Sequence, residues 1–231
     1  MVTISLCMIV KNEEAVIGRC LASIKDLVDE INIVDTGSTD RTRQIVQQFS
    51  VRLFDFEWIH HFAAARNFSF QQATKDYILW LDADDVLLPE DQKKLKALKA
   101  SLQPDIDAVS MNYNLSTDEE GNVTSFIRRN RLVRREKQFQ WIGAVHEYLA
   151  VSGKILDSDI AISHSPLSHD VDRNLNIYTQ LIESGETLSP RDLYYYANEL
   201  KDHSRYEEAI VYYEQFLSCH LGWFEDCIQA C

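Results

Sequence analysis

Short apolar runs alternate with helix-type patterns through the first half of the chain. Apolar runs at 3–10, 30–34, 51–54 and 77–81 have the length that is typical of strands buried on both faces of a parallel sheet. Between and after them, apolar residues recur at helical spacing, so we expect helices over 13–27, 39–49, 63–73 and 90–102. The alternation predicts an α/β fold in which a mostly parallel sheet is flanked by helices.

Polar residues gather where three of these strands end. They occupy residues 11–14, 35–40 and 82–85. In open α/β sheets the carboxyl ends of the strands form the ligand crevice. We therefore expect the three loops to lie together and form a binding site.

Asp82-Ala-Asp-Asp85 is the most informative of these loops. Three carboxylates so close together repel one another unless a cation lies between them. Mg²⁺ and Mn²⁺ take oxygen ligands and often bridge carboxylates to phosphates. The stretch could instead be a solvated loop that caps the helix expected from Pro89. Its position after a buried strand, beside the two other loops, favours metal binding.

The charge composition limits the kinds of molecule that we expect the chain to bind. The 231 residues carry 36 Asp and Glu against 23 Lys and Arg, a formal net charge of −13. This balance excludes a general nucleic-acid binder, which needs clustered basic residues, but not a nucleotide site with a bridging cation. The five cysteines lack a regular spacing, and no apolar run is long enough to span a membrane. Both observations favour a reducing, cytoplasmic location.

The second half of the chain changes character near residue 170. Strand-type patterns at 106–115, 124–133, 141–147 and 155–163 give way to amphipathic helices, and 190–223 fits one 34-residue tetratricopeptide-type repeat. We therefore expect two domains, 1–169 and 170–231. Because one repeat cannot bury its own apolar face, we expect the chain to be a piece of a longer protein with further repeats, or to form a homodimer through this segment.

Four short motifs resemble those of family 2 glycosyltransferases, inverting enzymes with a GT-A (Rossmann-like) fold. They are SLCMIVKNEE at 5–14, IVDTGSTD at 33–40, ARN at 65–67 and LWLDADD at 79–85, and the resemblance covers approximately residues 1–165. It implies that a nucleotide-sugar donor, a UDP-sugar, is bound with a Mn²⁺ or Mg²⁺ ion held by Asp84. The residues that it places around the donor are Val10, Asn12, Glu14, Asp35, Arg66, Asp82 and Ala83.

The segment WIGAVHE at 141–147 falls where such enzymes carry the acidic residue that deprotonates the acceptor. A carboxylate there can act as general base, and we expect Glu147 to do so, with His146 as the second candidate. Many members of the family have Glu-Asp where this chain has His-Glu. Glu147 could alternatively form a salt bridge with Arg134 or Arg135.

A histidine ends the last strand expected before the helices. The combination of Asp-x-Asp, then His-Glu, then His164 resembles the peptide S-glycosyltransferases of the sublancin type, which also carry helical repeats. That resemblance implies that His164 is the second metal ligand, with His169 a weaker candidate. We interpret His60-His61 as loop surface and the three tyrosines at 194–196 as packing within the repeat.

Together these features predict a metal-dependent inverting glycosyltransferase. The sugar would pass from a nucleotide-diphosphate donor to an acceptor, for which we expect a peptide side chain. One alternative keeps the fold but transfers to a saccharide or a lipid-linked sugar. The other is a non-catalytic repeat scaffold whose α/β part only binds a nucleotide.

Overall fold

The computed structural model describes residues 1–118, 120–167, 171–222 and 224–231. The chain divides into two compact units. The first comprises Met1–Trp58, Ala64–Ile142 and Leu149–His169, and the second comprises Ile59–Ala63, Gly143–Tyr148 and Asp170–Cys231. His169, which was a candidate ligand, and Trp223, at the end of the expected repeat, lie outside the described residues.

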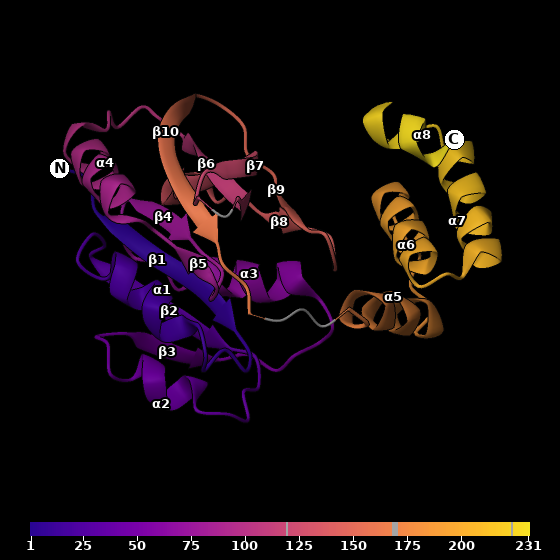
Figure 1. Ribbon diagram of the computed structural model, residues 1–231, viewed down its shortest axis with the longest axis horizontal. Coiled ribbons are helices and arrows are strands. Elements are labelled where there is room, and N and C mark those ends of the chain that lie inside the picture. Colours follow the sequence, from indigo (N-terminus) through magenta and orange to yellow (C-terminus); the bar gives the residue numbers. More distant parts are fainter. Residues whose placement is uncertain (119, 168–170, 223) are drawn as a thin grey trace. The chain divides into compact units, whose positions relative to one another are not determined.

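Eight strands of the first unit form one sheet, in the order β3-β2-β1-β4-β7-β6-β10-β5 (Figure 1). Their bounds are β1 Ile4–Val10, β2 Glu30–Asp35, β3 Arg52–Asp55, β4 Tyr77–Trp80, β5 Asp85–Val86, β6 Ala108–Thr117, β7 Val123–Arg134 and β10 Ile155–His164. The first four strands in this order are parallel to one another, and so are β6 and β10. Antiparallel β7 lies between β4 and β6. The sheet is thus mixed, with a parallel half built by the expected β/α alternation.

The helices of the first unit are α1 Ile17–Ile24, α2 Thr42–Val46 and α4 Pro89–Ser101, together with most of α3 Phe62–Gln71. The side chains of β1 alternate between the two faces of the sheet, as the period of a strand requires. Leu6 and Met8 belong to the main hydrophobic core with residues of α1, α2 and α4. On the other face, Cys7 Sγ lies 3.4 Å from the carbonyl oxygen of Ser69 on α3. Helices therefore cover both faces of the sheet.

Two helices are shorter than their sequence patterns indicate. α1 begins at Ile17 rather than near residue 13, and α2 spans Thr42–Val46, where the pattern predicted a helix from a cap at Thr39 or Asp40 to about residue 49. The residues before α1 bond to the second loop and to the start of α2: Glu13 N donates to Thr42 Oγ1 at 2.7 Å and Glu14 N donates to Asp40 Oδ2 at 3.1 Å. These groups join two loops of the site rather than starting helices.

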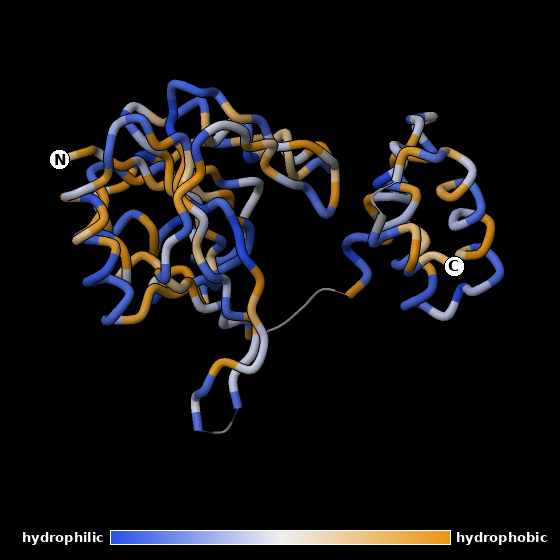
Figure 2. The backbone as a smooth tube through the Cα atoms, turned by 90° about the horizontal axis from the view of Figure 1, so that it is seen from above, coloured by the Kyte–Doolittle hydropathy of each residue, from blue (hydrophilic) through white to orange (hydrophobic). Residues whose placement is uncertain are grey.

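Three further features precede the last helices: a small two-stranded sheet, a short 3₁₀ helix and a long hairpin. β8 Trp141–Ile142 and β9 Tyr148–Leu149 form a separate two-stranded sheet, where the sequence pattern indicated one strand over 141–147. The short 3₁₀ helix Arg135–Lys137 follows β7. β6 and β7 extend as a hairpin with hydrophilic residues on either side of its tip (Figure 2).

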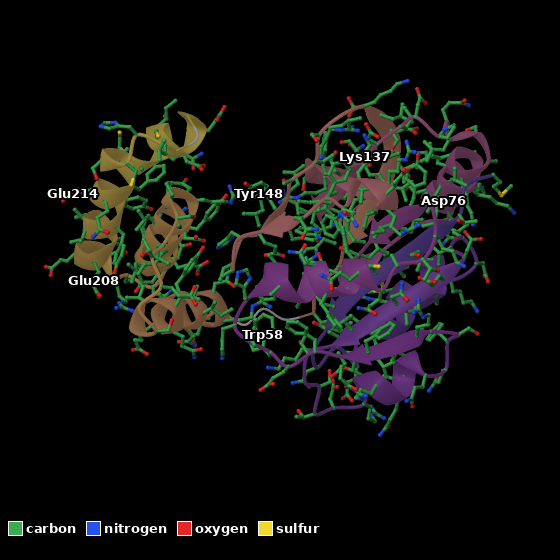
Figure 3. The ribbon with its side chains drawn as sticks, turned by 180° about the vertical axis from the view of Figure 1, so that it is seen from behind. Trp58, Asp76, Lys137, Tyr148, Glu208 and Glu214 are labelled. Atoms are coloured by element: carbon green, nitrogen blue, oxygen red, sulfur yellow. The ribbon has the colours of Figure 1, made fainter. Side chains whose placement is uncertain are left out.

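The second unit contains α5 Arg173–Glu183, α6 Pro190–Asp202, α7 Tyr206–Ser218 and α8 Phe224–Ala230. Ser189 caps α6 through a capping box with Asp192, and Pro190 opens the helix. α6 and α7 form a helical hairpin, in which the Tyr194 ring packs 5.3 Å from that of Phe216. On the exposed side of α7 lie Glu208 and Glu214 (Figure 3). The hairpin lies where the 34-residue pattern predicted it.

Candidate active site

The three polar loops leave the same edge of the sheet. β1 is hydrogen-bonded to β2 on one side and to β4 on the other, all three parallel, and Val10 is in register with Asp35. Residues 11–14 follow β1, the segment 35–40 begins with the last residue of β2, and residues 82–85 come shortly after β4. The sheet thereby brings together the loops that the sequence placed at one site.

Asn12 and Glu14 join the first loop to the second. Asn12 adopts a left-handed φ of 56°, and its Oδ1 accepts a hydrogen bond from the backbone N–H of Thr39 at 2.8 Å. Glu14 Oε2 accepts from the backbone N–H of Arg41 at 2.9 Å, and bonds from this backbone and side chain lower the pKa of Glu14. Val10 and Ala83 contribute no exposed side chain, because both are buried in the hydrophobic core.

Asp35 is a buried carboxylate whose two oxygens differ. Oδ1 accepts from the backbone N–H groups of Gly37 and Ser38, both at 2.9 Å, and lies 3.4 Å from Arg43 Nη1. Gly37 has a φ of 104°, which favours glycine in this turn. Asp35 Oδ2 is buried and has no hydrogen-bond partner among the described residues. A ligand hydroxyl is the kind of donor that would satisfy this oxygen.

Arg66 on α3 is held against Asp82. Its Nη2 lies 2.7 Å from Asp82 Oδ1, and its guanidinium lies 4.8 Å from the centre of the Trp141 ring. Asn67, the next residue, holds the backbone of that tryptophan. Its Nδ2 donates to the Trp141 carbonyl oxygen at 3.0 Å, and its Oδ1 accepts from the Trp141 backbone N–H at 2.8 Å. Burial opposes ionisation of Asp82, but the charges of Arg66 and Arg131 outweigh it and lower the pKa.

His164 comes to the acidic loop through a strand that the sequence did not indicate. β5 has only two residues, and its antiparallel pairing with β10 puts His164 opposite Asp85. His164 Nδ1 lies 3.5 Å from Asp84 Oδ1, 3.8 Å from Asp85 Oδ1 and 2.8 Å from the hydroxyl of Tyr113. The neighbouring carboxylates of Asp84 and Asp85 raise the pKa of His164 to about 10. Of the residues expected at the metal, Asp84 and His164 are therefore together.

Asp85 and Arg131 form a buried ion pair that sequence reasoning missed. Arg131 Nη1 lies 2.9 Å from Asp85 Oδ2, and both side chains are fully buried. The guanidinium is stacked between Trp80, at 3.9 Å from the ring centre, and Tyr113, at 4.3 Å. Asp85 Oδ2 also accepts from the backbone N–H of Asp82 at 2.9 Å. The sequence offered no local signal for this pair, because β7 carries four arginines and only Arg131 is buried.

Asp84, Asp85 and His164 fit a hard divalent cation. Each offers a ligand atom, and the three atoms lie within 4.8 Å of one another. Asp85 Oδ1 is buried without a hydrogen-bond partner among the described residues, which is costly unless a cation or donor approaches it. Carboxylate oxygen with one imidazole nitrogen is a donor set that suits Mn²⁺.

Glu147 and His146 belong to the second unit, in the segment 143–148. Both side chains are half-buried, and His146 Nε2 lies 2.8 Å from Glu199 Oε1. The alternative for Glu147 was a salt bridge with Arg134 or Arg135. Arg134 Nη2 lies 2.7 Å from Glu136 Oε2, and Arg135 Nε donates to the Lys75 carbonyl oxygen at 2.6 Å.

The tyrosines at 194–196 and the histidines at 60–61 differ in their burial and contacts. Tyr194 and Tyr196 are buried in the repeat as the pattern predicted. Tyr195 is half-buried and instead stacks on the His146 ring, with 4.3 Å between ring centres. His60 and His61 are half-buried.

The family model "Glycosyl transferase family 2" matches residues 5–159, which include all four motifs and both ends of the sheet. The chain belongs to this family. This glycosyltransferase-family chain is 28% identical over 230 residues to the SPbeta prophage-derived glycosyltransferase SunS of Bacillus subtilis, covering 94% of the chain and 53% of SunS. It is 37% identical over 147 residues to a TPR repeat-containing protein of Synechococcus elongatus, covering 64% of the chain and 35% of that protein. The chain thus spans between about a third and a half of these relatives.

Solved structures confirm the GT-A fold. S. aureus TarS 1–349 in complex with UDP-GlcNAc matches with a TM-score of 0.56 at 14% identity, covering 93% of this glycosyltransferase-family chain and 80% of TarS 1–349. Glucosyl-3-phosphoglycerate synthase from Mycobacterium tuberculosis, in complex with Mn²⁺, UDP and glucosyl-3-phosphoglycerate, matches with a TM-score of 0.52 at 17% identity, covering 81% and 82% of the two chains. Within the described ranges, no helix combines the length and the apolarity that crossing a bilayer requires.

Proposed function

We propose that this chain transfers a sugar from a UDP-sugar to a nucleophilic acceptor, with inversion at the anomeric carbon. The observation that carries the proposal is the cluster of Asp84, Asp85 and His164 beside the two other loops at the carboxyl end of the parallel strands. Further support comes from similar folds whose structures contain UDP-GlcNAc, or UDP with Mn²⁺.

Asp35, Asn12 and Glu14 would border the base and ribose of the donor. The unsatisfied buried Oδ2 of Asp35 suits a ribose hydroxyl or a base N–H. Asn12 and Glu14 already bond to the second loop, so their role is to hold the pocket wall in shape. Val10 and Ala83 would act through their backbone, because their side chains are in the core.

Arg66 and Asp82 would contact the sugar-diphosphate part of the donor. Their 2.7 Å ion pair fixes the orientation of both groups, and the guanidinium presents donors that match phosphate oxygens. Asp84 and His164, joined by Asp85, would hold Mn²⁺ or Mg²⁺. Such an ion neutralises the charge that develops on the leaving diphosphate.

Glu147 would remove the acceptor proton as the new bond forms, while the UDP leaves from the opposite side of the anomeric carbon. His146 is the weaker candidate, because its Nε2 bonds to Glu199 and its ring stacks on Tyr195. The acceptor that we propose is a peptide side chain. The match to SunS extends over 94% of the chain and so includes the helices, which would position the peptide or mediate a homodimer.

Thermal unfolding tests the donor site. UDP at about one hundred times its dissociation constant should stabilise the chain by roughly 2.7 kcal/mol, a rise of about 5–11 °C in the unfolding temperature for a chain of this size. We expect this shift with UDP and Mn²⁺ together, and not with EDTA or in Asp84→Asn. Asp26→Asn, the same change at an exposed carboxylate of the first unit, should behave as the wild type.

Release of UDP from UDP-GlcNAc and UDP-Glc then tests catalysis, with water as the acceptor. We expect turnover by the wild type and a loss of about a hundredfold or more in Glu147→Gln, the lower end for removing a general base. A chain that binds UDP with Mn²⁺ but releases none from either donor would favour the nucleotide-binding scaffold. A chain that no UDP preparation stabilises would refute the donor site.

A further inference from the structure

One face of α6 carries three polar or aromatic side chains at intervals of four residues, Arg191, Tyr195 and Glu199. This spacing places them one above another on the helix surface. The neighbouring residues Tyr194 and Ala197 are buried in the repeat. α6 therefore has a packing face and a second face with a different role.

All three side chains on this second face contact His146. Arg191 donates to the His146 carbonyl oxygen from Nη2 at 3.1 Å and from Nε at 3.3 Å. Tyr195 stacks on the imidazole, with the ring planes 17° apart. Glu199 Oε1 lies 2.8 Å from His146 Nε2. One residue of the segment 143–148 is thus held by its carbonyl, its ring face and its ring nitrogen.

The contacts extend along the segment on both sides of His146. The Arg191 guanidinium also lies 5.2 Å from the centre of the Tyr148 ring, which is labelled in Figure 3. At the other end, the Ala144 carbonyl accepts from the backbone N–H of Phe62 at 2.8 Å. Val145 is buried. The residue that carries the proposed base, Glu147, lies between two anchored neighbours.

The segment needs such anchors because its backbone is unfavourable on its own. Gly143 has a φ of 104°, which glycine adopts readily, but His146 has a φ of 49°. A left-handed φ at a residue other than glycine costs free energy and persists where the surroundings impose it. The contacts from α6 converge on the residue that is strained in this way.

The Glu199 side chain is held by a second contact besides the one with His146. Its side chain is 12% exposed, and its Oε1 also accepts from Asn174 Nδ2 of α5 at 3.0 Å. Burial opposes its charge, but the hydrogen bonds from His146 and Asn174 outweigh that effect and lower the pKa of Glu199. α5 and α6 therefore present a charged acceptor in one orientation.

We propose that α6 positions the segment that carries Glu147, with Arg191, Tyr195 and Glu199 as positioning residues for the sugar-transfer reaction. This inference rests on the proposed function and adds a role for the helices in the transfer step itself, besides binding an acceptor or a second chain. It predicts that damage to this face of α6 lowers kcat while the KM for the donor is unchanged.

Hydrogen exchange measured by mass spectrometry tests the anchoring without any assumption about activity. In the full chain, Glu199→Gln and Arg191→Met should raise the exchange rate of peptides covering 141–150 by about tenfold or more, the effect of weakening a charge-assisted hydrogen bond. Peptides of α7 should be unchanged, which shows that the repeat is folded. The matched controls are Asp202→Asn and Lys201→Met, the corresponding changes of a carboxylate to an amide and of a cation to methionine at exposed positions of α6. Unchanged exchange at 141–150 in both test variants would refute the anchoring.

Release of UDP from UDP-GlcNAc or UDP-Glc, beside the thermal shift by UDP and Mn²⁺, tests the positioning. We expect both variants to lose about tenfold or more in kcat while the donor KM and the thermal shift stay at wild-type values. Faster exchange at 141–150 with wild-type kcat would overturn the positioning role. A wild type that neither binds UDP nor releases it from a donor refutes the proposed function, and the exchange rates still decide the anchoring.

Discussion

Replacing Arg131 by methionine tests the buried ion pair under the acidic loop. Arg131 and Asp85 are both fully buried and 2.9 Å apart, and methionine fills much of the space between the Trp80 and Tyr113 rings without the charge. The Asp85 carboxylate then stays buried without its counter-charge. Removing one partner of such a pair costs about 3–5 kcal/mol in the free energy of unfolding. At about 2–4 °C per kcal/mol, we expect the unfolding temperature to fall by about 6–20 °C.

A double-mutant cycle separates this pair from general damage to the core. The wild type, Arg131→Met, Asp85→Asn and the double variant would be unfolded in urea with EDTA present, and followed by tryptophan fluorescence, since Trp80 and Trp141 both belong to the first unit. We expect the double variant to lose less stability than the two single losses added together, by roughly 0.5–3 kcal/mol. The second change removes the unpaired charge that the first one leaves.

Lys93→Met is the control for the loss of a paired cation in the first unit. Lys93 pairs with Glu90 at the surface, where both side chains are more than 70% exposed, and such pairs contribute little to stability. A loss below about 1 kcal/mol in Arg131→Met, or strict additivity in the cycle, would show that the Asp85 carboxylate does not depend on this guanidinium.

Three further outcomes follow from the described contacts. The pKa of His164 is raised to about 10 in the folded chain, so the stability that protonated His164 contributes is complete below pH 6.5 and is lost as the pH rises toward 10. Urea midpoints measured in EDTA should therefore show that the wild type loses its advantage over His164→Asn in that range. Gly153→Ala should lower the unfolding temperature by several degrees, because Gly153 has a φ of 97° and an added Cβ would collide with the Asp107 carboxylate; an unchanged melting curve would contradict this. Burial raises the pKa of Cys7 to about 12, so a thiol reagent at pH 8 should label exposed Cys231 quickly and Cys7 only after unfolding.

The sequence predicted the parallel half of the fold because period and length are local signals. β1, β2 and β4 follow from apolar runs, and the rule that ligands gather at the carboxyl ends of parallel strands placed their three loops at one edge. Strand order was less accessible. β7 enters the sheet between β4 and β6, and no local pattern fixes which neighbours a strand finally pairs with.

The missed features of the site all depend on contacts between residues that are distant in the chain. β5 has two residues, too few for any periodic pattern, yet its pairing with β10 brings His164 to Asp85. The partner of Asp85 is Arg131, 46 residues away, and a strand arginine gives no sign that it will be buried. Tyr195 was interpreted as repeat packing because its neighbours are, although its spacing from Arg191 and Glu199 was visible as a second stripe on the helix.

The charges of the candidate site bear on the proposed binding of an ion and a nucleotide there. Asp82, Asp84 and Asp85 face the guanidinium groups of Arg66 and Arg131 and the imidazole of His164, whose raised pKa keeps it protonated at neutral pH. The three negative charges are then balanced without any ligand. A divalent cation that takes a His164 nitrogen as ligand must displace the imidazolium proton, so its arrival adds a net single positive charge. That surplus favours an anionic diphosphate, and the diphosphate in turn favours the ion, since such coupling is reciprocal. On this charge balance, we expect the proposed ion and diphosphate to bind more tightly together than either binds alone.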